Sequence, residues 1–202
     1  MKIIKIKRFG EKELIKRLKA VRMLKASKIQ PYKDAVVTLE NLDTTELYCP
    51  QKYIIEQNLM DIANLDWEMR KYKVDIFNLN GFVRFWLKDE KEPRDFLPVI
   101  VEESIEANGK VANLICDGMH RAYYARTCWK IPQVAFIRGI PKQYPYYNYP
   151  MYKGDDWDKL DRFPALPLPE GYIKKWTREE NYKAYYKDFN SQFENVSVAR
   201  SA

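Results

Sequence analysis

The chain has few residues of the kinds that form disulfides and metal sites. It holds one histidine and three cysteines in 202 residues. The cysteines, Cys49, Cys116 and Cys128, are odd in number and widely spaced, so we expect free thiols and a reducing, cytoplasmic location. With one imidazole and no neighbouring pair of cysteines, we do not expect a zinc site.

Long apolar runs are also missing. No stretch approaches the roughly 18 apolar residues that a membrane-spanning helix needs, and 31% of the residues are charged. The start of the chain, Met1–Lys7, alternates lysine with isoleucine, which is typical of a strand rather than of a secretory leader. We therefore expect a soluble protein with no membrane partner and with one domain large enough for a substantial core.

The one histidine belongs to a short polar motif, Asp117-Gly118-Met119-His120-Arg121. Residues 111–116 before it are apolar and residues 122–129 after it are typical of a helix, so we predict a strand that turns through Asp-Gly into a helix. The free N–H groups of a first helical turn favour an anion. Gly118 permits close approach to the backbone, Arg121 offers a planar fork of donors, and His120 can donate a hydrogen bond or transfer a proton. The structural alternative is an aspartate N-cap followed by a solvated His-Arg pair.

Further strands are predicted on both sides of this 117–121 turn, at Leu97–Val101 and Pro132–Ile137. The stretch from Leu97 to Arg138 resembles the ParB/sulfiredoxin-like superfamily. Its members have a proline-containing strand, a second strand that ends in Gly-x-[His/Arg]-Arg, a helix and a further strand. The resemblance implies an α+β fold, a compact ParB/sulfiredoxin-like domain with a small mixed sheet and with helices added at both ends.

The superfamily has several activities, which the motif helps to separate. It includes CTP-binding partition proteins, ATP-using sulfiredoxins, nucleases and free-serine kinases. Sulfiredoxins have a cysteine where this chain has Met119, and the helix-turn-helix domain of partition proteins is not evident downstream. The Asp-Gly-x-His-Arg form most resembles the kinase branch. The resemblance implies binding of a nucleoside di- or triphosphate (ATP, ADP or CTP) with Mg²⁺, and phosphoryl transfer to a small hydroxyl substrate.

The resemblance also implies roles for individual residues. Four of them are expected to hold the phosphates: Gly118, Met119, His120 and Arg121. Asp117 and His120 are expected to be catalytic, with Asp117 placing the acceptor or the metal ion. A strand predicted at Ala35–Leu39 ends at Glu40, which can serve as general base if it lies within hydrogen-bond reach of the acceptor. The alternative for Glu40 is a solvent-facing residue in a turn.

Positive charge is concentrated at the N-terminus. Residues 1–28 hold eleven Lys and Arg and two Glu, a net charge of +9, whereas the whole chain carries +7. An amphipathic helix is predicted over Glu11–Ala26. Its apolar face is formed by Leu14, Leu18 and Val21, and its basic face by Lys12, Lys16 and Lys19. The basic face is either a nucleic-acid or acidic-partner surface or the solvated side of a docked helix.

Two further functions remain open from the sequence. One is a DNA-binding, nuclease-like component of a mobile-element or defence system, which uses residues 1–28 to contact the DNA backbone. The other is a catalytically inert, nucleotide-gated interaction module, which binds a nucleotide without turnover.

Three segments are expected within one domain: a basic strand and helix over 1–30, the ParB/sulfiredoxin-like core over 31–143, and an arm with a C-terminal helix over 144–202. Residues 50–72 have helical spacing, and Thr177–Glu180 has the pattern of a capping box that opens the last helix.

The Tyr144–Tyr152 arm holds five tyrosines and two prolines, so it is predicted to be extended. Its rings either wall a ligand pocket or pack across the core. Four aspartates follow, which either help to hold Mg²⁺ or start a helix: Asp155, Asp156, Asp158 and Asp161.

Overall fold

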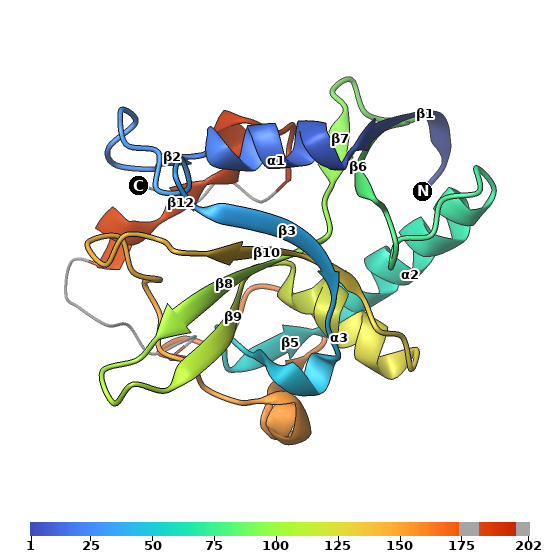
Figure 1. Cartoon of the computed structure of the whole chain (residues 1–202). Helices are drawn as coiled ribbons and strands as arrows, with labels where there is room; N and C mark the ends of the chain where they lie inside the picture. Colours follow the sequence, from blue (N-terminus) through green and yellow to red (C-terminus); the bar gives the residue numbers. More distant parts are fainter. Residues whose placement is uncertain (174–181, 197–202) are drawn as a thin grey trace.

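A five-stranded mixed sheet forms the centre of the molecule, with the strand order β3-β10-β8-β9-β4 (Figure 1). The computed structural model describes residues 1–173 and 182–196. The strands of this sheet are β3 (Val36–Asn41), β4 (Leu47–Tyr48), β8 (Val99–Ile105), β9 (Val111–Asp117) and β10 (Gln133–Arg138). Strands β8 and β10 are parallel, as are β4 and β9, whereas β3 with β10 and β8 with β9 are antiparallel. The predicted α+β fold with a mixed sheet is confirmed.

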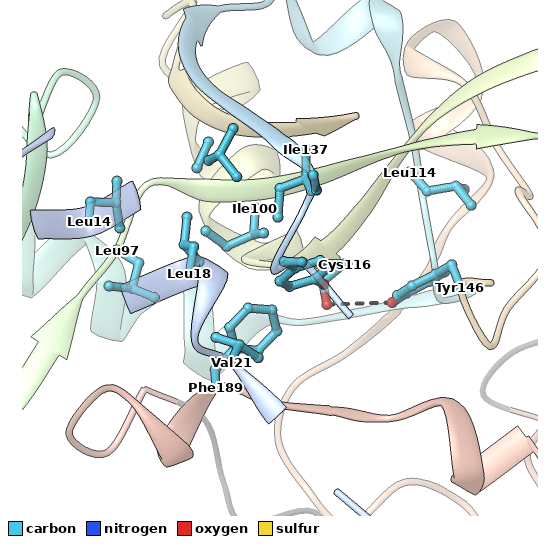
Figure 2. Close-up of a cluster of buried hydrophobic side chains, with 14 of the residues drawn as sticks. Leu14, Leu18, Val21, Leu97, Ile100, Leu114, Cys116, Ile137, Tyr146 and Phe189 are labelled. Carbon is cyan, nitrogen blue, oxygen red and sulfur yellow. Dashed lines mark hydrogen bonds between the residues drawn. The ribbon is translucent and has the colours of Figure 1, made fainter. Parts of the chain in front are cut away.

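Both faces of this sheet are covered, which explains the consecutive apolar residues Val99–Val101 in β8 and Val134–Ile137 in β10. On one face, Ile100 and Ile137 pack with Leu18 of α1 (Glu11–Lys19), as Figure 2 shows. On the other face, Val101 packs with Met119 of α3 (Met119–Thr127). Each strand therefore contributes alternate side chains to two separate clusters.

A smaller antiparallel sheet has the order β1-β6-β7. Its strands are β1 (Ile3–Gly10), β6 (Gly81–Leu87) and β7 (Arg94–Phe96). The rings of Phe9 and Phe82, which face each other across β1 and β6, are stacked with centroids 4.4 Å apart. A third buried cluster joins this sheet to the helix α2 (Glu56–Arg70), which packs beside α3. Two short pairs complete the fold: β5 (Tyr53–Ile55) with β11 (Asp161–Phe163), and β2 (Arg22–Met23) with β12 (Lys187–Asp188).

Two predicted helices are shorter than expected. The N-terminal helix ends at Lys19 rather than at Ala26, because the chain then forms β2, which pairs with β12. Leu14 and Leu18 of its predicted apolar face are fully buried, and Val21 is also fully buried but lies beyond the end of the helix. The helix expected over residues 50–72 begins only at Glu56. The residues before it form β5, because their backbone pairs with β11.

The C-terminal part differs from its expectation as well. The capping box at Thr177–Glu180 lies outside the described residues. The described residues that follow form no α-helix but 3-10 turns at Tyr182–Tyr185 and Phe189–Ser191 around β12. The buried Lys187 holds this segment against the sheet, because its Nζ donates to Oε2 of Glu102 over 3.3 Å.

Candidate functional site: the turn between β9 and α3

The 117–121 turn has the strand–turn–helix geometry that its sequence predicts. Strand β9 ends at Asp117, α3 begins at Met119, and Gly118 between them adopts a φ of +91°. This left-handed conformation favours glycine. A Cβ at Gly118 would also lie 2.6 Å from Nη2 of Arg121, so the guanidinium would have to move away from the turn. Glycine therefore allows Arg121 to lie directly over the turn.

Arg121 and Asp117 form an ion pair at the mouth of this turn. Nη2 of Arg121 donates to Oδ2 of Asp117 over 2.6 Å, and the two side chains are 16% and 12% exposed. The guanidinium also lies 5.3 Å from the centre of the Phe96 ring. Among the residues that the structure describes, Nε of Arg121 is a buried donor without a hydrogen-bond partner. A buried N–H group that bonds to nothing is costly, and an anion at this turn would satisfy it.

One ring nitrogen of His120 is already occupied by a hydrogen bond with the backbone. Its Nε2 accepts a hydrogen bond from the backbone N–H of Ile55 over 2.9 Å. Burial, and secondarily the charge of Arg121, lowers the pKa of His120 from 6.5 to about 4. The ring is therefore neutral at pH 7, with its proton on Nδ1, and it cannot act as a cation toward phosphate.

The turn opens into a pocket of about 480 Å³. Asp117, Gly118, Met119, His120 and Arg121 all line it, so the structure brings the whole motif together. Helix α2 supplies the opposite wall, with Asn58 and Asp61, and Arg94 at the start of β7 adds a second guanidinium. No pattern in the sequence singles out these three residues, because their places depend on how α2 and β7 pack against α3.

The Tyr144–Tyr152 arm packs into the core, as one of its two interpretations expects, and it also borders the pocket. Tyr146 and Tyr147 are buried in the main core cluster, and both also line the pocket. The hydroxyl of Tyr146 donates to the backbone oxygen of Cys116, the residue before the turn, over 3.4 Å (Figure 2). The arm thus fixes one wall of the pocket from the core side.

Glu40 lies elsewhere, and its expected position beside the turn is wrong. It is on β3, which β10 and β8 separate from β9. Its carboxylate accepts hydrogen bonds from Arg138 over 2.6 and 2.9 Å, and this pairing lowers the pKa of Glu40. The sequence could not reveal this, because the strand order is set by pairing between distant segments.

Three of the four aspartates near Trp157, Asp156, Asp158 and Asp161, also lie outside the pocket lining. The backbone of all four belongs to a 3-10 turn, Gly154–Lys159, or to the strand that follows it, and the N-cap of the turn is Lys153 rather than Asp155. Within residues 1–173 and 182–196, no three His, Cys, Asp or Glu side chains are grouped so that they could hold a metal ion. In the same ranges, none of the helices has the length and apolar character to span a bilayer. All three cysteines are free.

Comparison with known proteins identifies the family to which the chain belongs. Searches among curated proteins and among solved structures gave no match. The family model described as ParB CE domain matches residues 13–161, which cover most of the chain and include the central sheet, the 117–121 turn and α2. The match confirms the ParB part of the resemblance that the motif indicates. The chain belongs to the ParB CE domain family.

Proposed function

We propose that this protein binds a nucleoside di- or triphosphate at the 117–121 turn and transfers a phosphoryl group from it to a small hydroxyl substrate. The observation that carries the proposal is the unpartnered Nε of Arg121, buried beside the N-terminus of α3. The guanidinium and the free N–H groups of the first helical turn face the same pocket, so they can bind phosphate oxygens together.

The other donors of the pocket suit a polyphosphate rather than a single anion. Arg94 lines the same pocket as Arg121. Two guanidinium groups can neutralise charge that spreads over two phosphates as a phosphoryl group is transferred, and positioning and electrostatics supply most of the catalysis in such reactions. Arg94 forms two hydrogen bonds with Glu90, at 2.6 and 2.7 Å, and a polyphosphate would have to displace or share them.

Two carboxylates in the pocket replace Glu40 as candidates for the base. Arg121 neutralises Asp117, whereas Asp61 accepts a hydrogen bond from the uncharged amide of Gln57, over 3.0 Å. We therefore assign to Asp61 the removal of the acceptor hydroxyl proton, and to Asp117 the orientation of Arg121.

Magnesium fits this pocket only together with a nucleotide. The pocket offers two carboxylates, and Mg²⁺ in phosphotransferases is often held by one or two carboxylates plus phosphate oxygens. Asp117 would be its protein ligand, while Asp61 remains the base. When bound, the ion would neutralise charge on the transferring phosphates.

Isothermal titration calorimetry with ATP, ADP and CTP, with and without Mg²⁺, tests the proposal. The variants are Arg121→Gln and, as a matched control, Arg138→Gln, whose guanidinium forms an ion pair on β3 and β10 outside the pocket. We expect binding by the wild type and by Arg138→Gln, and a loss of at least about tenfold in affinity for Arg121→Gln. If folded wild-type protein binds none of the three nucleotides, the proposal is wrong.

Turnover distinguishes the kinase from the inert module. We expect a panel of small hydroxyl compounds to include an acceptor that accelerates release of the nucleotide product, which is ADP from ATP, CDP from CTP or AMP from ADP. Nucleotide binding without any turnover would favour the nucleotide-gated interaction module instead.

A further inference from the structure

The far end of α3 presents an exposed tryptophan in an unfavourable backbone conformation. Trp129 is 95% exposed and has a φ of +54°. It follows the last turn of the helix, where the N–H of Lys130 donates to the oxygen of Ala125 over 2.9 Å. The N–H of Trp129 donates to the oxygen of Arg126 over 3.1 Å. These two bonds define a Schellman motif, whose left-handed position is usually occupied by glycine.

Trp129 lowers the stability of the isolated chain, and its exposed ring gains little packing within the chain to offset this. A residue with a Cβ is strained in the left-handed region, and a large aromatic ring in water adds an unfavourable apolar surface. At 95% exposure, the ring buries almost nothing within its own chain. A contact with another molecule that covers the ring would offset both costs.

A groove of about 700 Å³ lies beside Trp129, between the end of α3 and the turn Thr44–Glu46. Ile131, 56% exposed, lies on its rim, and Tyr123 forms part of its lining. The ring of Tyr123 stacks on the buried Trp157, with centroids 6.2 Å apart and planes 8° apart. The groove therefore has a rigid aromatic wall, which is suited to receive another aromatic side chain.

The charges around the groove have both signs. Arg126 and Lys130 line it on the α3 side, and Asp43 lines it on the opposite side, next to the exposed Glu46. Asp43 and Glu46 cap the same turn reciprocally, so their positions are fixed. A strongly acidic or basic partner would meet like charge on one side. A second copy of the same patch, related by a two-fold axis, would match acid to base on both sides.

We propose that this face is an interface between two copies of the chain, in which Trp129 of each copy fills the groove of the other. The interface is isologous, which is the commonest way in which identical chains form closed assemblies. It lies at the end of α3 opposite the 117–121 turn, and it does not depend on the proposed nucleotide site.

Sedimentation equilibrium of the full chain over a range of micromolar concentrations tests the proposal. The variant is Trp129→Gly, which removes the ring and suits the left-handed backbone. The matched control is Lys73→Gly: Lys73 has a φ of +56° after α2, and Val74 donates to the oxygen of Met69 over 3.1 Å in the same type of motif. Both variants remove the backbone strain of a left-handed residue, but only Trp129→Gly changes the groove.

We expect dimeric wild type, dimeric Lys73→Gly and monomeric Trp129→Gly. We also expect the melting temperature of Trp129→Gly to exceed that of wild type at dilutions where wild type has dissociated, which shows that the variant is folded. A wild type that stays monomeric at the highest concentration overturns the proposal, and leaves a different protein as the occupant of the groove. A Trp129→Gly variant that remains dimeric also overturns it, because the interface then lies elsewhere.

Discussion

The backbone N–H of Ile55 donates to Nε2 of His120 over 2.9 Å. Ile55 is the N-cap of α2 and His120 lies in the first turn of α3, so this bond ties together the two helices that wall the pocket. We therefore propose that His120 is a positioning residue, which helps to set the distance between Asn58 and Asp61 on one wall and the 117–121 turn on the other.

The burial of His120, helped by the nearby charge of Arg121, makes stability depend on pH in a defined direction. The pKa of His120 is about 4 in the folded chain, against an ordinary value of 6.5. The folded chain therefore binds a proton at His120 more weakly than the unfolded chain does. Stability from this residue is complete above the ordinary pKa and falls as the pH drops from there toward the folded pKa. We expect the wild type to lose about 2 kcal/mol of unfolding free energy through His120 between neutral pH and about pH 5.

Urea denaturation of wild type and His120→Leu at both pH values measures this effect. The variant has a lower stability at neutral pH, because the N–H of Ile55 loses its acceptor. Its loss on acidification should be smaller than that of wild type. Equal losses in the two proteins would show that His120 does not titrate as described.

Glycine at position 118 is required by conformation and by space. Gly118→Ala places a Cβ at a φ of +91° and 2.6 Å from Nη2 of Arg121. We expect a loss of at least about tenfold in nucleotide affinity, because the guanidinium must leave the turn. Gly109→Ala is the matched control, since Gly109 also has a positive φ, of +79°, but meets nothing within 4 Å.

Both glycine variants should lose about 1 kcal/mol of stability from the left-handed backbone. Only Gly118→Ala should lose nucleotide binding. Calorimetric titration of the two proteins under the same conditions gives the comparison, and a similar affinity for both would argue against a phosphate site at the 117–121 turn.

Asp61 and Glu40 should behave in opposite ways in a turnover assay. Asp61→Asn should retain nucleotide binding and lose at least about a hundredfold in turnover, the usual contribution of a general base. Glu40→Gln should leave turnover unchanged, because Glu40 pairs with Arg138 outside the pocket. Steady-state kinetics on the two variants tests the assignment of Asp61 as the base. The assignment is wrong if Glu40→Gln, rather than Asp61→Asn, is the inactive variant.

The basic face of α1 provides a test of the DNA-binding alternative. Lys12 and Lys16 are exposed and Lys19 is half-buried, on the side of α1 away from the buried leucines. If this face binds DNA, replacing all three by Gln should lower the affinity. It should also reduce the salt dependence of binding, by roughly 0.9 in the log–log slope for each phosphate that the protein no longer neutralises. Fluorescence anisotropy with a short duplex over a range of salt concentrations measures the slope. If the slope is unchanged, the basic face of α1 does not contact DNA and is only the solvated side of a docked helix, the alternative that the amphipathic pattern also allows.

Local patterns predict the parts of the fold that depend on neighbouring residues. The turn at 117–121 follows from an apolar strand, one glycine and a helical segment, and the strands on either side follow from short apolar runs. The mixed sheet follows from the family resemblance that these segments support.

The sequence predictions that differ from the structure concern elements placed by pairing between distant segments. Strand β5 pairs with β11, more than a hundred residues away, so a helical pattern over residues 50–72 could not reveal it. A position at the end of a strand suggests that Glu40 lies near the turn, but the sheet order puts two strands between β3 and β9. Asn58, Asp61 and Arg94 reach the pocket through packing of separate elements, for which a single sequence holds no signal.

The most direct test of the central claim is the amide NMR spectrum of ¹⁵N-labelled protein titrated with ATP and Mg²⁺. If phosphate binds the first turn of α3, the largest shifts should fall on the N–H groups of Met119, His120 and Arg121, whose bonds point to the anion. The Nε–H of Arg121 should also shift as it gains a partner. Saturable shifts confined to other residues, or no shifts at saturating nucleotide, would contradict the account.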